Sequence, residues 1–180
     1  MPRRAFFNTT MLTPAESKRS FAYIDGANLH KGTVELGWYV DYSRFYIWLH
    51  EKFRIEKAYI FIGHISKYES LYSKMRTAGF VLVFKEITLG DHGQVKGNCD
   101  ADLVLYAIRD FYESSPDQAV FVSSDGDFTS TISFLMNKGL TVRLVSPSKN
   151  CSLLLLKTNV PLVYLNTQRD LIRLKPIFRP

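Results

Sequence analysis

The chain has 180 residues, of which 46% are hydrophobic, so it is long enough for one α/β domain with a buried core and too apolar for a disordered chain. No apolar run is long enough to span a bilayer, and residues 1–20 lack the continuous apolar core of a signal peptide. The two cysteines, Cys99 and Cys151, show no zinc-site spacing. We therefore expect a cytoplasmic protein with reduced thiols and no membrane attachment.

The net charge of +6 is concentrated at the two ends of the chain. Residues 1–19 and residues 166–180 each carry four basic side chains and one acidic side chain, and the body between them is neutral. Basic ends suit a polyanionic partner, because Lys and Arg displace counterions from phosphates; a role in solubility alone is the alternative. We predict a basic, flexible N-terminal segment (1–19), a folded domain (20–166) and a basic C-terminal extension (167–180).

In the first half of the domain, short apolar runs alternate with amphipathic stretches. FAYIDG (21–26) is typical of a buried strand that ends in a sharp turn, and the apolar residues of 42–53 lie on one face of a helix. The next elements expected are a strand at AYIFIGH (58–64), a helix over 68–75 that ends at Gly79, and a strand at FVLVFKEI (80–87).

The second half continues the alternation after a polar, glycine-rich segment, TLGDHGQVKGNC (88–99), which is expected to be an exposed loop. A helix follows, with Asp100 near its N-cap. The remaining elements expected are a strand at 119–125, a helix over 128–136 that stops at Gly139, a strand at 141–147, a short buried helix at 151–158 and a strand at 162–165.

Strands separated by helices with short connections favour a parallel sheet, because parallel neighbours need a crossover element. Right-handed crossovers place helices on both faces of such a sheet. The fold class predicted is therefore α/β: one domain, a three-layer α/β/α sandwich with a central, mostly parallel sheet of the Rossmann-like kind.

Five aspartates are placed where such a fold collects ligands, at the carboxyl ends of the strands. Asp25 ends the first strand and Asp125 the fourth, and Asp127 follows at the start of the next helix. Asp100 and Asp102 open the helix after the glycine-rich segment. If the first and fourth strands are neighbours, these carboxylates converge on one edge of the sheet.

Carboxylates held together without a counter-charge repel one another, and a divalent cation removes that repulsion. Ligation by oxygen alone favours Mg²⁺ or Mn²⁺, which can activate water for attack on a phosphodiester. Whether one ion or two would bind is open. Each acid also has a structural alternative: Asp100 and Asp127 are good N-caps, and Asp25 before Gly26 is ordinary turn chemistry.

Polar residues near these acids are further candidates for the site. Asn28, three residues after Asp25, can hold a water or a carboxylate through its amide. The candidate contacts to the phosphates of a nucleic-acid substrate are Lys31, Lys96, Ser123 and Ser124.

Other hydrolase signatures are weak or missing in the sequence. His30 and His64 follow strand ends, so a catalytic role for either is a minor alternative, and the four histidines show no metal-site spacing. Without a GxSxG elbow or a P-loop, the sequence argues against an α/β-hydrolase and an NTPase.

Three segments carry a family resemblance: YIDGANLH (23–30), KGNCDADLVLYAI (96–108) and FVSSDGDFTSTISFLMNKG (121–139). In order and separation they resemble the NYN domain of the PIN-like nuclease superfamily, in particular its LabA/limkain-like branch, over roughly residues 20–166. The resemblance implies a PIN-like α/β/α fold and cleavage of RNA that depends on Mg²⁺ or Mn²⁺.

The family's functional positions match residues of this chain one by one. The first acid with its companion asparagine matches Asp25 and Asn28, and the lysine before the middle motif matches Lys96. The remaining acidic positions match Asp100, Asp102, Asp125 and Asp127. The chain departs from the pattern at Asn98-Cys99, where the family has small or apolar residues, and this affects the expected shape of the loop.

The sequence thus predicts an endoribonuclease whose metal ligands are Asp25, Asp100, Asp125 and Asp127, with Asn28 and Asp102 completing the catalytic set. One alternative is a non-catalytic RNA-binding or adaptor module on the same fold. Another is a receiver domain, which also gathers aspartates around Mg²⁺, although an Asp-Gly-Asp run replaces the Ser/Thr expected after its fourth strand. A homodimer and a regulatory protein partner are both compatible with the sequence.

Overall fold

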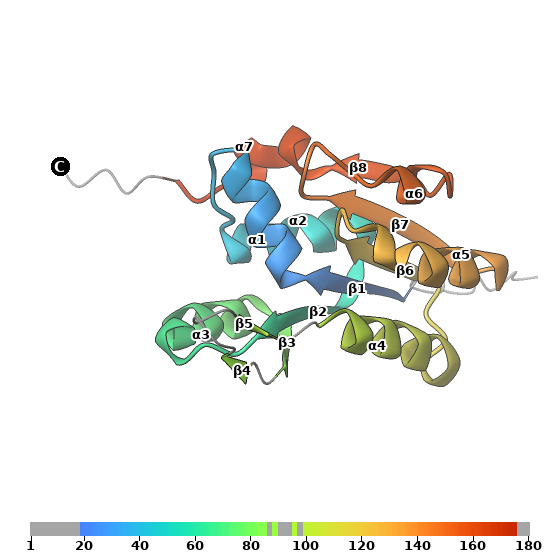
Figure 1. Ribbon diagram of the computed structural model, residues 1–180, viewed down its shortest axis with the longest axis horizontal. Helices are drawn as coiled ribbons and strands as arrows, with labels where there is room; N and C mark the ends of the chain where they lie inside the picture. The colour runs from blue at the N-terminus through green and yellow to red at the C-terminus, as the bar shows by residue number, and fades with distance from the viewer. Residues whose placement is uncertain (1–18, 86–87, 90–94, 97–98, 176–180) are drawn as a thin grey trace, which may run out of the picture.

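The computed structural model describes residues 19–85, 88–89, 95–96 and 99–175, with backbone only for 88–89 and 95–96. The predicted N-terminal segment therefore lies almost wholly outside the described residues. Six strands form one parallel sheet in the order β3-β2-β1-β6-β7-β8 (Figure 1). The strands are β1 (Ser20–Asp25), β2 (Ile55–Gly63), β3 (Val81–Lys85), β6 (Gln118–Val122), β7 (Thr141–Ser146) and β8 (Leu162–Tyr164).

Helices cover both faces of the sheet, as parallel connections require. The α-helices are α1 (Gly26–Glu35), α2 (Tyr42–Phe53), α3 (Glu69–Ala78), α4 (Asp100–Glu113), α5 (Thr129–Asn137), α6 (Leu153–Leu156) and α7 (Arg169–Ile172). Short 3₁₀ helices are η1 (Ser66–Tyr68), η3 (Gly126–Phe128) and η4 (Leu165–Gln168). One core lies between the sheet and α1, α2, α3 and α7, and a second core lies beneath α4, α5 and α6. The predicted three-layer α/β/α sandwich is confirmed.

The central strand β1 is buried on both of its faces, which explains its unbroken apolar sequence. Phe21 and Tyr23 pack on the side of α4 and α5, whereas Ala22 and Ile24 pack on the side of α1 and α2. Because side chains alternate along a strand, Asp25 continues the series of Phe21 and Tyr23. The last residue of β1 is thereby directed toward the face that α4 covers.

The structure differs from the expected sharp turn after the first strand, because α1 begins directly at Gly26. Its apolar side chains are too few to make a clear helical stripe: of its ten residues, the buried ones are Gly26, Leu29, Gly32 and Thr33. Gly26 is required by packing, since a Cβ there would lie 2.9 Å from the carbonyl oxygen of Phe61 on β2. A helix that packs through glycines leaves little hydrophobic periodicity in the sequence.

Two further expectations need correction. The segment 88–99, expected to be an exposed loop, contains two short antiparallel strands, β4 (Thr88–Leu89) and β5 (Val95–Lys96). The helix expected to be buried at 151–158 is the single turn α6, on which only Leu155 is buried and Leu153, Leu154 and Leu156 are exposed. The four consecutive leucines exceed what one short turn can bury.

The residues after 166, expected to form a basic extension, begin with ordered structure. Ile172 of α7 is fully buried in the core beneath α2, and its carbonyl oxygen accepts a hydrogen bond from the backbone N–H of Asp41 at 2.9 Å. The backbone N–H of Leu174 donates to the carbonyl oxygen of Tyr39 at 2.8 Å. Among the helices that the structure describes, none has the length and apolar character needed to cross a membrane.

Candidate metal centre

The site forms where the order of the strands reverses. From β1 the chain proceeds through β2 and β3 toward one edge of the sheet, and from β6 through β7 and β8 toward the other. The first and fourth strands are therefore neighbours, with Ile24 opposite Val122 in their parallel register. Asp25 ends β1, and Asp125 follows three residues after the end of β6. Both acids stand at the carboxyl edge, at the switch point where open α/β sheets bind ligands.

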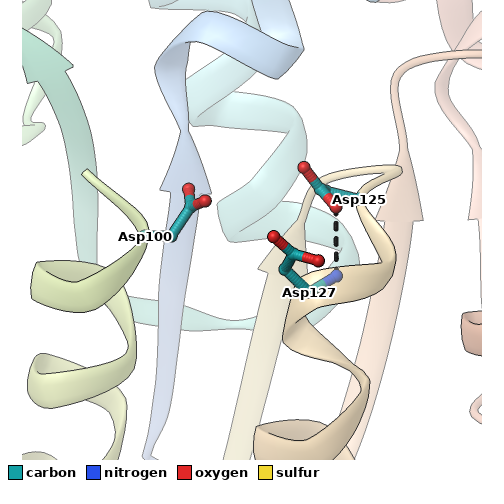
Figure 2. A group of neighbouring side chains, drawn as sticks. All are labelled: Asp100, Asp125 and Asp127. Atoms are coloured by element: carbon teal, nitrogen blue, oxygen red, sulfur yellow. Dashed lines mark hydrogen bonds between the residues drawn. The ribbon is translucent and has the colours of Figure 1, made fainter. Parts of the chain in front are cut away.

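Three carboxylates converge at this edge from two different elements. Asp100 projects from the first turn of α4 toward the loop that holds Asp125 and Asp127 (Figure 2). One carboxylate oxygen from each of the three lies within 4.8 Å of the others, and only Asp127 is largely exposed. A set of donors made up of carboxylate oxygens alone suits a hard divalent cation such as Mg²⁺ or Mn²⁺.

The helix-capping roles of the aspartates are the reverse of those expected from the sequence. Asp125 is the N-cap of η3 and accepts the backbone N–H of Asp127 at 3.0 Å, and Asp25 is the N-cap of α1. Cys99 precedes α4 without a side-chain cap, so Asp100 lies within the first helical turn, as Asp127 does in η3. The assignment of Asp100 and Asp127 as N-caps was wrong, so capping does not account for the presence of these two acids.

Asp25 lies deeper than the three clustered acids, at 9% exposure. Its Oδ1 accepts the backbone N–H of Asn28 at 3.0 Å, and its Oδ2 accepts the hydroxyl of Ser123 at 3.3 Å. Burial raises the pKa of Asp25 above its ordinary value, and the charges of Asp100 and Asp125 raise it further against these two hydrogen bonds. The negative charges of the cluster therefore act on the carboxyl group of Asp25. The role of Asp25 as a metal ligand stays a prediction.

Asn28 joins α1 to the end of β6. The side-chain Oδ1 of Asn28 accepts a hydrogen bond from the backbone N–H of Ser124 at 2.9 Å. Asp25 is bound by the backbone N–H of Asn28 and not by its side-chain amide. The hydroxyl of Ser124 lies 3.1 Å from that of Ser146 and accepts the backbone N–H of Ser148 at 3.2 Å. These bonds hold the ends of β1, β6 and β7 together beneath the carboxylates.

Asp102 is directed to a different partner, the ammonium group of Lys85, at 3.0 Å. Lys85 ends β3 at the same carboxyl edge, and the sequence analysis did not select it. Its position was a usable signal, because a charged residue that ends a parallel strand lies beside the other strand ends. The pair places a positive charge two residues along α4 from Asp100.

A polar cavity of about 250 Å³ adjoins Asn28 and Ser124. It lies between α1 and the segment after β7, and its other lining residues are Lys31, Gly32, Glu35, Ser148 and Asn150. Of the residues predicted to contact RNA, Lys31 and Ser124 thus share one cavity, and Ser123 is buried against Asp25. The side chain of Lys96 lies outside the described residues.

Cys99, the point of departure from the family pattern, is partly buried beside the carboxylates. Burial raises the pKa of its thiol to about 11, and the charges of Asp25, Asp102 and Asp100 add to the effect. Without a bound metal, the thiol is therefore protonated at neutral pH.

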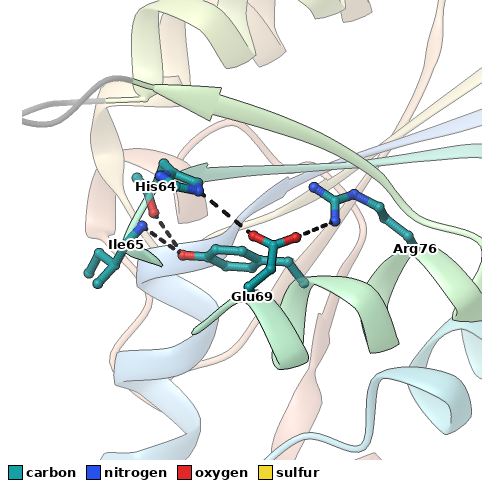
Figure 3. Close-up of polar contacts among 6 residues, drawn as sticks. His64, Ile65, Glu69 and Arg76 are labelled. Atoms are coloured by element: carbon teal, nitrogen blue, oxygen red, sulfur yellow. Dashed lines mark hydrogen bonds and ion pairs between the residues drawn. The ribbon is translucent and has the colours of Figure 1, made fainter. Parts of the chain in front are cut away.

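Of the two histidines considered, His64 directly follows β2 and belongs to a separate polar group with residues of α3 (Figure 3). Its Nε2 lies 3.8 Å from Glu69, which is bound by Arg76 at 2.9 Å, and its ring packs against Tyr72 and Phe84. These are the contacts of the His64 ring, and among the described residues none of them links it to the three clustered acids. The ring of His30 forms a tilted pair with the ring of Tyr39.

Comparison with known proteins identifies the family. A family model for the NYN domain matches residues 20–159, a range that contains all five aspartates. The chain belongs to the NYN domain family. NYN domains are PIN-like nucleases, so the resemblance found in the sequence is confirmed at the level of the family.

The fold has a solved counterpart as well. The NYN chain is similar to the crystal structure of a protein of unknown function, VPA0982, from Vibrio parahaemolyticus, with a TM-score of 0.76 and 20% sequence identity. The likeness covers 91% of this chain and 100% of that chain. Comparison with curated proteins gives no match. The neighbour therefore supports the three-layer fold, and the family match supports nuclease chemistry at the family level.

Proposed function

We propose that this NYN protein is a metal-dependent endoribonuclease. The observation that carries the proposal is the group of Asp100, Asp125 and Asp127, whose oxygens lie within 4.8 Å of one another at the switch point of the sheet. Three carboxylates this close repel one another strongly unless a cation binds between them. An acid group of this kind suits the nuclease chemistry of the family.

The metal ligands in this proposal are Asp100, Asp125 and Asp127, with the buried Asp25 as a further one. A divalent ion bound there lowers the pKa of water and offsets the charge that develops on a phosphodiester during hydrolysis. The protein positions the acids through its backbone: the N–H of Asp127 fixes Asp125, and Ser123 and the N–H of Asn28 fix Asp25. Asp102, held by Lys85, acts by positioning the first turn of α4.

The polar cavity beside Asn28 provides a place for the part of the RNA next to the reacting phosphate. Lys31 and Asn150 line it together with Ser148, so it offers a cation and several hydrogen-bond donors within one space. Those donors suit a phosphate or a ribose hydroxyl. Lys31 is therefore proposed to bind substrate, and Ser124 to shape the wall of the cavity.

The test is cleavage of labelled RNA by purified protein with Mn²⁺ and with EDTA. Asp125→Asn removes one negative charge from the group but keeps an oxygen that can accept the N–H of Asp127. Asp170→Asn is the matched control, because Asp170 is an exposed acid of α7 that pairs with Arg173. We expect cleavage with Mn²⁺ to be lost in Asp125→Asn and unchanged in Asp170→Asn.

Equal cleavage by the wild type and Asp125→Asn would overturn the proposed site. RNA binding that weakens steeply with salt, with no turnover under any metal condition, would instead favour the alternative of a non-catalytic RNA-binding module.

A further inference from the structure

A cavity of about 380 Å³ lies at the end of the sheet where the strands begin, opposite to the end that carries the acids. It lies between the C-terminal end of α2 and the first residues of β6, β7 and β8. Three basic side chains line it, Lys52, Arg54 and Arg143, and no acidic side chain among the described residues does. We call these three residues with Ser20 and Gln118 the basic pocket.

The backbone of Arg54 points to a function beyond folding. Arg54 ends α2 in the left-handed conformation, with φ 54° and ψ 47°. Glycine is the residue favoured there, because a side chain adds strain in this conformation. A non-glycine residue in such a position is a reason to look for a functional role of its side chain. The guanidinium of Arg54 makes no ion pair with any residue that the structure describes.

Arg143 adds a second guanidinium that is partly withdrawn from water. It lies on β7 opposite Val120 of β6 and is only partly exposed, and no carboxylate among the described residues pairs with it. A partly desolvated cation gains more from an anion than a fully solvated one does. The nearby acid Glu56 is already bound by Arg19 at 3.0 Å, so it does not neutralise the basic pocket.

One polar group of the basic pocket, the hydroxyl of Ser20, has a proton left to donate. Gln118 uses its amide nitrogen to bind the hydroxyl oxygen of Ser20 and the carbonyl oxygen of Phe53, each at 3.2 Å. The carbonyl oxygen of Phe53, at the end of α2, therefore already accepts a hydrogen bond. Ser20 is 1% exposed and accepts from Gln118, and among the described residues its hydroxyl proton has no acceptor. A bound anion would supply that acceptor.

We propose that the basic pocket binds a phosphate group, through Arg54 and Arg143 with Lys52 at the rim. Two guanidinium groups offer paired donors that match phosphate oxygens, and the apolar wall made by Phe53 and Leu162 suits the organic part of a ligand. The phosphate belongs either to a free nucleotide or to an RNA strand. The basic pocket lies on the sheet edge opposite to the acids, so it is a site in addition to the metal centre.

The experiment measures binding in EDTA, where hydrolysis at the metal centre plays no part, with adenosine monophosphate, adenosine and a short single-stranded RNA as probes. The test variant is Arg54→Gln/Arg143→Gln. Its control, Lys67→Gln/Lys74→Gln, removes the same charge from exposed residues of η1 and α3. We expect the test variant alone to weaken binding of a phosphate-bearing probe by about tenfold or more, as for lost charge-assisted hydrogen bonds.

The probes separate the two sources of phosphate. Binding of adenosine monophosphate but not adenosine, lost in the test variant, assigns the pocket to a nucleotide; an effect confined to the RNA assigns it to a strand. The single variant Arg54→Gly guards against misfolding, because glycine suits the left-handed backbone and we expect a melting temperature at least equal to the wild type. The proposal is overturned if neither phosphate-bearing probe binds, or if both double variants bind the probes equally well.

Discussion

The backbone N–H of Asp127 donates a hydrogen bond of 3.0 Å to the side chain of Asp125, so the main chain at one acid of the loop after β6 holds the carboxylate of the other. The same carboxylate group caps η3, and the backbone N–H of Asp125 itself is bound by the hydroxyl of Ser123 at 3.1 Å. The loop thus brings two negative charges together through bonds that do not depend on a cation. Capping and the proposed metal binding are two separate roles of one side chain.

Two substitutions of Asp125 separate these roles. Asp125→Asn keeps the capping oxygen and loses the charge, so we expect a large loss of Mn²⁺ affinity with little loss of stability in EDTA. Asp125→Ala loses both, and its free energy of unfolding should fall by about 1 kcal/mol relative to Asp125→Asn. Calorimetric Mn²⁺ titration and urea unfolding in EDTA measure the two effects. Equal stability of the two variants would show that the cap contributes nothing.

Asp100 and Asp102 provide a matched pair on one helix turn. Asp100 belongs to the clustered acids, whereas Asp102 pairs with Lys85 at 3.0 Å. We expect Asp100→Asn to lower Mn²⁺ affinity by tenfold or more, as for about 1.4 kcal/mol of lost ligation, and Asp102→Asn to lower it less. Because the pair with Lys85 is partly exposed, breaking it should cost at most about 1 kcal/mol of stability.

The same titration, with Lys85→Gln as an added variant, provides the check. Lys85→Gln removes the cation and leaves Asp102 charged, so it should disturb the site more than Asp102→Asn if the pair positions α4. A larger loss of Mn²⁺ affinity from Asp102→Asn than from Asp100→Asn would reverse our assignment of ligand and positioning residue.

Gly126 is where the acidic loop meets α6. A Cβ at Gly126 would lie 2.5 Å from the hydroxyl oxygen of Ser152, closer than side chains pack. We expect Gly126→Ala to displace the loop and to reduce Mn²⁺-dependent cleavage by about a hundredfold, since small displacements of catalytic groups have effects of this size. In Gly126→Ala/Ser152→Ala the hydroxyl is gone, and the activity should recover in part.

The comparison for this test is Ser152→Ala alone. Ser152 caps α6 by accepting the N–H of Leu154 at 3.3 Å, so this variant should lose some stability while keeping its activity. A double variant no more active than Gly126→Ala would show that the contact with Ser152 does not set the position of the loop.

The sequence predicted the sheet well, because the middle of β1 and most of β6 are buried and carry continuous runs of apolar residues. It predicted the convergence of the acids on the condition that the first and fourth strands are neighbours, which the strand order satisfies. It missed α1, whose buried positions include Gly26 and Gly32 and so lack a hydrophobic stripe. The hydrophobic pattern of a sequence predicts a buried face reliably only where the buried residues have large apolar side chains.

The helix caps and the ion pairs could not be predicted from the sequence, for a different reason. Whether Asp125 or Asp127 caps η3 depends on where the helical turn begins, within a margin of one or two residues. The pairing of Lys85 with Asp102 depends on how α4 crosses the end of β3, a tertiary arrangement to which the 86–99 segment gives no local clue. The ends of the predicted strands indicated where the acids converge. Which side chains pair with one another there could be seen only in the folded structure.

The raised pKa of Asp25 predicts how the stability of the metal-free protein depends on pH. Burial, with Asp100 and Asp125 nearby, raises this pKa above the ordinary 3.8 in the folded state. As the pH rises from below 3.8, the unfolded chain releases this proton first, so the contribution of Asp25 to the free energy of unfolding falls until the pH passes the raised pKa. At pH 7 in EDTA, the ionised Asp25 therefore destabilises the fold.

Asp25→Asn removes this ionisation while keeping an oxygen that can accept the N–H of Asn28. We expect its melting temperature in EDTA to exceed that of the wild type at pH 7, and the difference to shrink as the pH approaches 4. Added Mn²⁺ should raise the melting temperature of the wild type more than that of Asp25→Asn, because binding stabilises the state that binds. Asp170→Asn, at an exposed acid outside the cluster, serves as the control. A variant less stable than the wild type at pH 7 in EDTA would mean that the hydrogen bonds from Ser123 and Asn28 outweigh the cost of burying the charge.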